Sequence, residues 1–520
     1  EQFGIRSLEF SPEFGFKLNG KKIFLQGNAN HHDLGALGAT CYDKAIERMM
    51  LQLKSFGYNC IRCSHNPYSD SFARIADRVG ILVVDELTDK WSDNDYWGGR
   101  QPFTHIWHKL ITEWIKRDRN RPSIILWSLG NELQIREGWA GFEGTNDWGI
   151  TTYNIFNQLV KRWDHTRLTT VAMFPARAGA ITRHDKEFND YLVPPELACA
   201  TEVASFNYQS DKYDAYLKYR PDLILFQSEA ETSNLLQPYY NMDKERMVGI
   251  AYWGSVEYWG ESNKWPKKGW NYSFFEHTMR PYPQAYLIKT AFMPEIPEVH
   301  IGVVDAAGAE SVSWNDVIVG RMALNECWNH TPGSRRSLFT FTNAHSVELL
   351  VNGQSMGIQK NDTTQANLRN MIYWKDVPYG NGGSVVAIAR DKSGKEVARH
   401  RIETAGKAVA LRIEAETPTD WKADGMDLQY INVTVIDKKG RPVWDYNEPL
   451  TLQMEGAARL VALDNGDHYT DELFHGITSK RMYQGRMQII LRSDQEAGNV
   501  TVKISSAGLK GTLRLKTIKE

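Results

Sequence analysis

Residues 124–132 read IILWSLGNE, an apolar run of strand length that ends in an amide and a carboxyl group. Eight apolar runs of this kind occur between residues 23 and 293, and helical stretches separate them. This alternation is typical of successive βα units, and the nearly continuous apolar composition of several runs indicates strands covered on both faces. The runs are Ile23–Gly27, Cys60–Ser64, Ile81–Asp85, Ile124–Leu129, Leu168–Phe174, Ala204–Tyr208, Leu223–Gln227 and Gly249–Trp253.

The stretches between the runs carry the periodicity of amphipathic helices. In Asp43–Phe56, apolar residues recur at helical spacing. They are Ile46, Met49, Met50, Leu53 and Phe56. Eight βα units predict a (β/α)8 TIM barrel over residues 23–293, and a doubly wound open sheet is the alternative.

The pattern changes after Pro294 and Pro297, where the sequence begins to alternate with a period of two and to turn at glycine. Val347–Val351 runs into Asn352-Gly353, a strong hairpin signal. The alternation predicts two antiparallel β-sandwich domains of the immunoglobulin-like kind, over residues 294–404 and 405–520, each of about a hundred residues. We interpret residues 1–22 as a lead-in, the tail of a preceding domain, because the chain begins without Met.

The composition describes an ordinary globular protein and argues against two kinds of partner. Its 61 basic and 63 acidic side chains give a net charge of −2, which disfavours binding to nucleic acid or to an anionic membrane surface. No apolar stretch reaches the roughly 18 residues that a membrane helix needs. The 17 tryptophans favour carbohydrate, since indole faces stack on sugar rings, although core packing explains them equally well.

The five cysteines do not indicate a disulfide framework, because their number is odd and they are sparse. Cys60 and Cys63 form a Cys-x-x-Cys pair within a predicted strand, where residues three apart face opposite sides. No second pair accompanies them, so we expect neither a zinc site nor redox chemistry there.

Two carboxyl groups follow apolar strands at the end where a barrel carries its reactive side chains. Glu132 follows the run at 124–129, and Glu229 follows the run at 223–227. A single glutamate at a strand end usually forms a salt bridge or caps a helix. Two of them on distant strands of one barrel favour catalysis over that alternative.

A pair of carboxyl groups matches the chemistry of glycosidic bond cleavage. One group protonates the departing oxygen and the other traps the oxocarbenium-like centre; a separation of about 5–5.5 Å permits direct attack and retention of configuration. The acid must stay protonated near neutral pH, while donors such as Arg62 and a tyrosine hydroxyl keep the nucleophile ionised. Asn131, next to Glu132, is placed to hold the sugar 2-hydroxyl.

Further polar side chains lie at other predicted strand ends. They include the neighbouring His31 and His32, then His65 after the second strand and Tyr208 after the sixth. Metal binding is the rival interpretation of the histidines, but no ligand frame accompanies them, and neutral imidazoles suit sugar hydroxyls without a metal. Trp253 ends the eighth strand, where it could form the floor of a sugar site or plug the barrel.

These motifs resemble those of glycoside hydrolase family 2, and several of them recur in order across the whole barrel. They are Leu25-Gln-Gly-Asn-Ala-Asn-His-His-Asp-Leu-Gly35, Asn59-Cys-Ile-Arg-Cys-Ser-His-Asn-Pro67, Asp85-Glu86, Arg117-Asp-Arg-Asn-Arg-Pro-Ser123 and Trp127-Ser-Leu-Gly-Asn-Glu132. The family contains retaining β-galactosidases, β-glucuronidases and β-mannosidases. The resemblance implies that Glu132 is the acid/base and Glu229 the nucleophile. It also implies that Tyr208 donates to the nucleophile and that other side chains contact the sugar, namely His31, His65, Asn131 and Trp253.

Three departures from the family pattern shape the expectations. Magnesium-dependent β-galactosidases carry Glu and His where this sequence has Lys90 and Ser92, and an ammonium repels a cation, so we expect no such magnesium. The β-glucuronidases carry an Asn-x-Lys that grips the sugar carboxylate. The nearest stretch here is Trp265-Pro-Lys-Lys-Gly269, which disfavours uronides, although its two lysines leave an acidic sugar open. The family's N-terminal sandwich and the following immunoglobulin-like domain are missing, which indicates a fragment with impaired activity.

From the residues and the resemblance together we expect a retaining exo-β-galactosidase that releases terminal galactose by double displacement and uses no cofactor. The alternatives are a β-glucuronidase or other family 2 glycosidase, and a carbohydrate-binding protein on a disabled barrel. The expected partner is a carbohydrate, with neither nucleic acid nor membrane involved and a homo-oligomer left open. The sandwiches resemble accessory domains of a secreted β-galactosidase branch, which implies a periplasmic or secreted protein.

Overall fold

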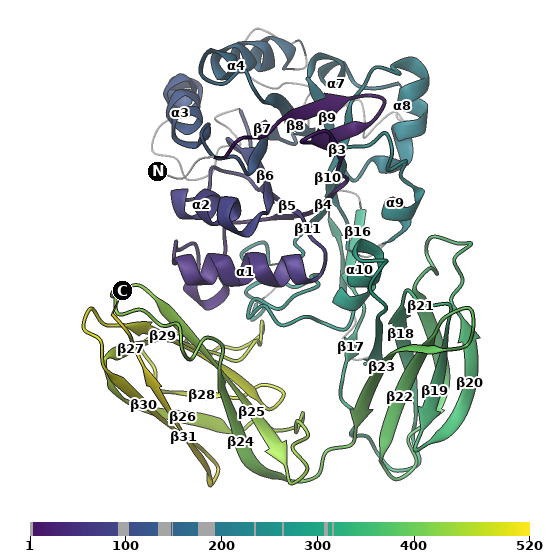
Figure 1. Cartoon of the computed structure of the whole chain (residues 1–520), viewed down its shortest axis with the longest axis vertical. Coiled ribbons are helices and arrows are strands. Elements are labelled where there is room, and N and C mark those ends of the chain that lie inside the picture. Colours follow the sequence, from purple (N-terminus) through teal and green to yellow (C-terminus); the bar gives the residue numbers. More distant parts are fainter. Residues whose placement is uncertain are drawn as a thin grey trace. The chain divides into compact units, whose positions relative to one another are not determined.

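A computed structural model describes residues 4–91, 103–133, 147, 149–174, 193–232, 236–262, 265–305, 310–314 and 317–519. The chain forms two compact units (Figure 1). The first comprises residues 1–32, 50–255 and 313–319, and it contains the strands of a barrel. The second comprises residues 33–49, 256–312 and 320–520, and it contains two pairs of antiparallel sheets. Among the described residues, no helix has the length and apolar character needed to cross a bilayer.

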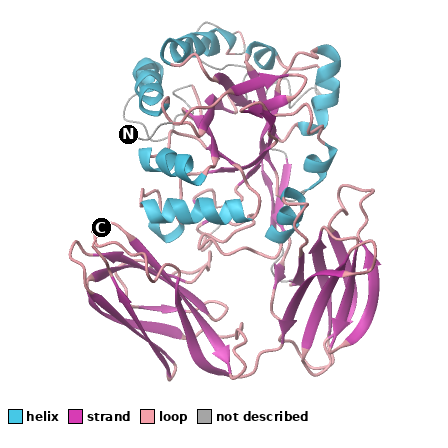
Figure 2. Cartoon of the chain, in the orientation of Figure 1, coloured by secondary structure: helices cyan, strands magenta, loops and turns pink. Residues whose placement is uncertain are grey.

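Eight parallel strands close into a barrel, and this confirms the TIM-barrel prediction (Figure 2). The chain order of the strands is also their order around the barrel, and β11 pairs with β4 to close it. The strands are β4 (Leu25–Asn30), β5 (Cys60–Cys63), β6 (Leu82–Glu86), β7 (Ile124–Asn131), β8 (Leu168–Met173), β9 (Val203–Asn207), β10 (Leu225–Ala230) and β11 (Gly249–Trp253).

Burial on both faces explains why the barrel strands are apolar runs. All eight residues of β7 are buried, and so are all four of β5. At the seam, Gly249 of β11 faces Leu25 of β4, and a Cβ atom on Gly249 would lie 2.4 Å from the Leu25 carbonyl oxygen. The two strands can therefore approach this closely only because residue 249 has no side chain.

Helices follow the strands around the barrel, as Figure 2 shows. Their ends carry the expected signals: Ser69 accepts a hydrogen bond from the Phe72 amide at the start of α2, and Gly80 ends that helix in the left-handed conformation. The helices are α1 (Asp43–Ser55), α2 (Asp70–Val79), α3 (Phe103–Asp118), α4 (Ile150–Trp163), α7 (Glu196–Ala200), α8 (Tyr213–Tyr219), α9 (Leu236–Asn241) and α10 (Ala285–Phe292), with 3-10 turns η1 (Gly35–Leu37) and η3 (Ser210–Lys212).

The segment before the barrel contains strands that were not predicted from the sequence. It forms a three-stranded antiparallel sheet of β1 (Leu8–Ser11), β2 (Gly15–Leu18) and β3 (Lys21–Lys22). The Lys22 ammonium group donates to the carbonyl of Met247, 2.8 Å away, just before β11. The first barrel strand accordingly begins at Leu25, two residues later than the apolar run at Ile23 suggested.

Two β-sandwiches follow, as the period-two alternation predicted. The first joins sheets β17-β14-β18-β21 and β20-β19-β22-β23, and the second joins β24-β25-β29-β27 and β28-β26-β30-β31. Their strands are β14 (Val299–Val304), β17 (Leu324–Asn325), β18 (Arg335–Thr342), β19 (Ser346–Val351), β20 (Gln354–Lys360), β21 (Met371–Pro378), β22 (Ser384–Arg390), β23 (Glu396–Glu403), β24 (Ala408–Ala415), β25 (Leu428–Asp437), β26 (Pro449–Gly456), β27 (Ala458–Asp464), β28 (Ser479–Arg481), β29 (Arg486–Ser493), β30 (Asn499–Ser506) and β31 (Leu509–Lys516). Two small ribbons complete the chain, β12 (Tyr258–Trp259) with β13 (Gly269–Trp270) and β15 (Glu310–Trp314) with β16 (Val317–Arg321).

Alternating burial distinguishes these strands from those of the barrel. In β30 every second residue is buried, and each sandwich has an apolar core of its own. Asn352 and Gly353 join β19 to β20 with φ values of 52° and 83°, as a type I′ hairpin turn requires. The predicted hairpin at Asn352-Gly353 is therefore confirmed, both in the turn and in the two strands that the turn joins.

Candidate active site

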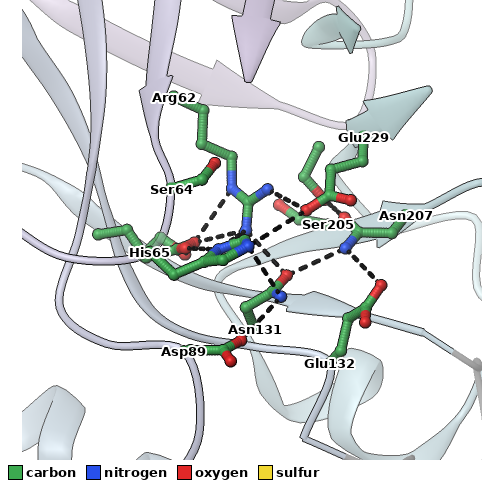
Figure 3. A network of polar contacts seen from close by, with 12 residues as sticks. Arg62, Ser64, His65, Asp89, Asn131, Glu132, Ser205, Asn207 and Glu229 are labelled. Atoms are coloured by element: carbon green, nitrogen blue, oxygen red, sulfur yellow. Dashed lines mark hydrogen bonds and ion pairs between the residues drawn. The ribbon is translucent and has the colours of Figure 1, made fainter. Parts of the chain in front are cut away.

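Side chains from the carboxyl ends of four barrel strands meet at one mouth of the barrel (Figure 3). Glu132 follows the last residue of β7, and Glu229 is the second-last residue of β10. Arg62 comes from β5 and Asn207 ends β9. Because carboxyl ends of parallel strands share one edge, residues up to 167 positions apart in sequence are hydrogen-bonded here.

Arg62 is the central cation of this cluster and is almost completely buried. It donates to Glu229 Oε1 at 2.7 Å, to Glu86 Oε2 at 2.7 Å and to Asn131 Oδ1 at 2.9 Å. Burial alone would lower the pKa of Arg62, but the two carboxylates outweigh it and raise that pKa. The guanidinium therefore stays charged and fixes the orientation of three neighbours.

Two amides connect the two carboxyl groups. The side-chain amide of Asn207 donates to Asn131 Oδ1 at 3.0 Å and to Glu132 Oε1 at 3.1 Å, and it lies between the glutamates in Figure 3. Since Arg62 bonds both Asn131 and Glu229, a continuous path of hydrogen bonds runs from one carboxyl group to the other. A shift of either amide would therefore change the relative positions of Glu132 and Glu229.

Glu229 accepts hydrogen bonds from two strong donors. Arg62 bonds one of its oxygens, and the Tyr208 hydroxyl donates to the other at 2.8 Å. Both bonds stabilise negative charge on this carboxylate, and they leave its side chain little freedom to rotate. This is the arrangement that a carboxylate nucleophile needs.

Glu132 has the opposite electrostatic environment. Burial, and next the negative charge of Glu229, raise the pKa of Glu132 to about 8. The nearby Lys90 ammonium and the bond from Asn207 act in the other direction but are weaker. Glu132 is therefore protonated at neutral pH and can donate a proton, whereas Glu229 accepts hydrogen bonds from Arg62 and Tyr208.

The backbone is strained at two of these residues. Glu132 has φ of 49° and Tyr208 has φ of 58°, in the left-handed region that residues with a Cβ atom seldom adopt. Both follow the end of a barrel strand directly, where the chain must turn sharply to direct a side chain across the mouth. Such strain is concentrated at functional sites in proteins.

Three of the predicted sugar-contacting residues, His31, His65 and Trp253, pack together at the ends of β4, β5 and β11. The Trp253 indole stacks on the His65 ring at 5.3 Å, and the His31 ring meets it edge-on at 5.1 Å. His65 Nδ1 lies 2.6 Å from Glu86 Oε1. A pocket of about 680 Å³ opens beside His31, His65 and Asp89, a volume typical of small-ligand sites, although its described lining does not include the two catalytic candidates.

Three residues of the cluster are missing from the sites predicted from sequence. Glu86 is fully buried between Arg62, His65 and the Ser128 hydroxyl; Asp89 and Asn207 each bond Asn131. Glu86 and Asn207 both end barrel strands, so the rule that found Glu132 would also have found them. No sequence signal marks Asp89, which follows a strand by three residues.

Lys90 occupies a defined place beside the acid candidate. Its ammonium group pairs with Asp89 at 2.6 Å and donates to the Asn131 carbonyl at 3.1 Å. A fixed positive charge at this position repels a divalent cation. The expectation that no magnesium binds here stays a prediction. Ser92, the second position of that comparison, lies outside the described residues.

Comparisons with known proteins give three matches to family models. The model of the glycosyl hydrolases family 2 TIM barrel domain matches residues 13–246, and that of the glycoside hydrolase family 2 C-terminal domain 5 matches residues 411–513. A domain of unknown function (DUF4982) matches residues 333–398.

Relatives of known sequence or structure match nearly the whole chain. A putative β-glucuronidase of Formosa agariphila is 44% identical, with 99% of this chain and 50% of that protein covered. The β-galactosidase BoGH2A of Bacteroides ovatus is 27% identical, with coverage of 98% and 63%. A solved glycosyl hydrolase family 2 member from Bacteroides cellulosilyticus has a TM-score of 0.88 and 28% identity, with coverage of 99% and 65%. The chain thus spans between half and two thirds of the length of these relatives.

Proposed function

The chain belongs to glycoside hydrolase family 2, and on that premise we propose that it is the catalytic part of a retaining exo-β-glycosidase acting on oligo- or polysaccharides. One observation carries the proposal: two carboxyl groups share a single hydrogen-bonded frame but differ in electrostatic environment. Glu132 is a buried acid with a pKa of about 8, and Glu229 is clamped by Arg62 and Tyr208. That division of roles is what double displacement requires.

In the first step, the Glu229 carboxylate attacks the anomeric carbon, and the bond from that carbon to the aglycone oxygen breaks. Glu132 passes its proton to the departing oxygen, so the aglycone leaves as an alcohol and a glycosyl ester forms on Glu229. In the second step, the Glu132 carboxylate takes a proton from water while the water oxygen attacks the same carbon, and the ester bond from that carbon to Glu229 breaks. The sugar is released with its original configuration, and both glutamates return to their starting states.

The surrounding residues bind and orient the sugar in this scheme. His31 and His65 offer imidazole nitrogens to hydroxyl groups, and the Trp253 indole supplies an apolar face. Asn131 sits beside Glu132 and is held by Arg62 and Asn207, so its amide is pre-oriented for the 2-hydroxyl. Pre-orientation matters because only contacts that strengthen in the transition state raise the rate.

A terminal β-galactoside is the first candidate substrate and a β-glucuronide is the second. The relative BoGH2A is named as a β-galactosidase, and Pro266 stands where β-glucuronidases carry their asparagine. The second candidate is favoured by the 44% identical relative, which is named as a putative β-glucuronidase. The two lysines of the stretch Trp265-Pro-Lys-Lys-Gly269 also leave an acidic sugar open, since an ammonium group pairs with a carboxylate.

A panel of chromogenic β-galactoside, β-glucuronide and β-mannoside separates these candidates. Lys267→Met adds a second criterion: it will abolish glucuronide hydrolysis if the ammonium grips a sugar carboxylate, and will leave galactoside hydrolysis within a few-fold. The exposed Lys109→Met is the matched control. Hydrolysis of only the glucuronide would overturn the first candidate.

Substitutions of the two glutamates test the mechanism itself. Glu229→Gln will lower turnover by several orders of magnitude, whereas the exposed Glu9→Gln will not. Glu132→Ala will slow substrates with poor leaving groups by roughly 10²–10⁴-fold and activated aryl glycosides far less. If the unmodified chain turns over no faster than Glu229→Gln yet still binds oligosaccharide, the carbohydrate-binding alternative replaces the enzyme.

A further inference from the structure

Three metal-ligating side chains converge in the second unit, outside the candidate active site. Glu257 follows β11, His277 lies in the segment before α10, and His468 lies between β27 and β28 of the second sandwich. All three are buried, and one ligand atom from each lies within 4.8 Å of the other two. Residues up to 211 positions apart in sequence thus meet at one point.

The contacts among the three converge on one carboxylate oxygen. His277 Nδ1 lies 3.1 Å and His468 Nε2 2.9 Å from the same oxygen, Glu257 Oε2. The His468 contact falls outside hydrogen-bond geometry, and within the described part of the chain neither nitrogen of that ring has a hydrogen-bond partner. A buried imidazole that is close to a carboxylate but not hydrogen-bonded to it can direct a nitrogen lone pair at a cation bound beside the carboxylate oxygen.

We propose that Glu257, His277 and His468 form a metal site for a divalent cation of the zinc class. Two imidazoles and one carboxylate are the ligands that zinc uses with a fourth, exchangeable position. Bonds of about 2.0–2.2 Å to a tetrahedral centre place ligand atoms roughly 3.3–3.6 Å apart. Small adjustments of the two short contacts reach that spacing. Nitrogen ligands favour zinc over magnesium or calcium, which take oxygen donors.

Partners behind the ligands hold them in the required orientation. Asp464 Oδ1 lies 2.9 Å from His277 Nε2, so this ring can donate backwards and direct the lone pair of Nδ1 at the cation. On the other side, the Tyr282 hydroxyl donates to Glu257 Oε1 at 2.6 Å, and the backbone N–H of His277 donates to Oε2 at 3.1 Å, so the carboxylate is held with Oε2 facing the two imidazoles. A carboxylate behind a histidine ligand is the usual outer shell of a zinc site.

The site has both anionic and cationic neighbours. His277 lies between two carboxylates, 3.1 Å from Glu257 and 2.9 Å from Asp464, and the Arg321 guanidinium lies 3.4 Å from Glu257 Oε1. In the occupied site two nitrogens and one oxygen would bind the cation. A pocket of about 120 Å³, lined by Glu257 and His468 among others, provides access and room for a water ligand.

The occupied site would fasten the segment after the barrel's last strand to the second sandwich. A bond across 211 residues closes a long loop, so its loss increases the entropy of the opened state. The role we assign is a structural clip, and a test by unfolding temperature is therefore independent of glycosidase activity.

The experiment uses the full chain without a polyhistidine tag, stripped with a chelator and titrated with Zn²⁺ by calorimetry, with metal content measured by mass spectrometry. We expect one zinc per chain and a higher unfolding temperature. Co²⁺ as a spectroscopic substitute will give the intense visible bands of four-coordination. His468→Ala will weaken binding at least 100-fold, and the exposed His475→Ala in the same loop will not.

Asp464→Asn keeps the shape of the side chain but weakens its hold on His277, and it will weaken zinc binding about 10- to 100-fold. If His468→Ala folds poorly, His468→Gln and Asp464→Asn take its place in the binding measurement. Substoichiometric zinc, or equal binding by the unmodified chain and His468→Gln, would overturn the proposal and leave a purely protonated histidine–carboxylate network.

Discussion

The protonation of a single side chain sets the pH range in which the proposed chemistry can operate. The pKa of Glu132 is raised to about 8 by burial and by Glu229, so the acid form prevails below that pH and is lost as the pH rises through it. We predict that kcat/KM for a substrate with a poor leaving group falls about tenfold per unit above pH 8. A pH profile measures this. A profile of Glu132→Ala on an activated substrate that keeps the same alkaline limb would contradict it.

Lys90 provides a way to shift that limb. Its ammonium group is the main charge that lowers the pKa of Glu132, so its removal will raise that pKa further. In Lys90→Met the alkaline limb of kcat/KM will therefore move to higher pH, whereas Lys109→Met, on an exposed helix face, will leave it in place. A limb that moves to lower pH would show that Lys90 acts through the position of Asn131 and not through its charge.

Sequence reasoning located those side chains that end strands. Glu132, Glu229, Arg62 and Tyr208 could be placed together because the carboxyl ends of barrel strands share one rim, and the structure brings them together. Their catalytic roles stay proposals. Glu86 ends the strand next to that of Arg62 and could have been found by the same rule, but its ion pair with Arg62 depends on the register between β5 and β6, which the sequence does not show. Asp89 lies in a loop whose course depends on neighbours distant in sequence.

At the scale of elements, patterns of burial decided which predictions succeeded. Apolar runs marked all eight barrel strands to within three residues at either end, because both faces of each strand are covered. The helix expected at Asp43–Phe56 is α1. The three short strands before the barrel were not predicted, since runs of two to four half-buried residues carry no clear periodicity.

The hairpin between β19 and β20 permits a test of turn chemistry. Gly353 has φ of 83°, and a Cβ atom there would meet no atom within 4 Å, so Gly353→Ala introduces backbone strain without a clash. We predict a loss of about 1–2 kcal/mol in the local stability of the hairpin. Hydrogen exchange of the β19 and β20 amides will then be about 5- to 30-fold faster.

Gly406→Ala serves as the control for this substitution. Gly406 does not have a positive φ, and its added Cβ atom would make an ordinary contact of 3.5 Å with Asp437. Gly406→Ala will therefore have a negligible effect on hydrogen exchange of the β19 and β20 amides. Equal exchange in both variants would mean that the turn does not limit the opening of these strands.

At the scale of the whole molecule, the barrel depends on one seam between its first and last strands. In Gly249→Ala the new methyl group would meet the backbone of Leu25, which cannot move without separating β11 from β4. We predict a destabilisation of about 3 kcal/mol or more, seen as a lower unfolding temperature or as insoluble protein. Ala251→Gly at the same seam, where no clash arises, will cost only about 1 kcal/mol. A soluble Gly249→Ala variant of unchanged unfolding temperature would contradict this explanation of closure.

The left-handed backbone at Glu132 has an evolutionary consequence. Glu132→Gly removes both the conformational strain and a carboxyl group that burial disfavours in its charged form, at some entropic cost of the added glycine. We predict an inactive barrel that is about 1 kcal/mol more stable, measurable as a higher midpoint of thermal unfolding. Selection for thermal stability alone would favour glycine at this position. The glutamate therefore supplies the proposed catalytic group at a cost in thermal stability.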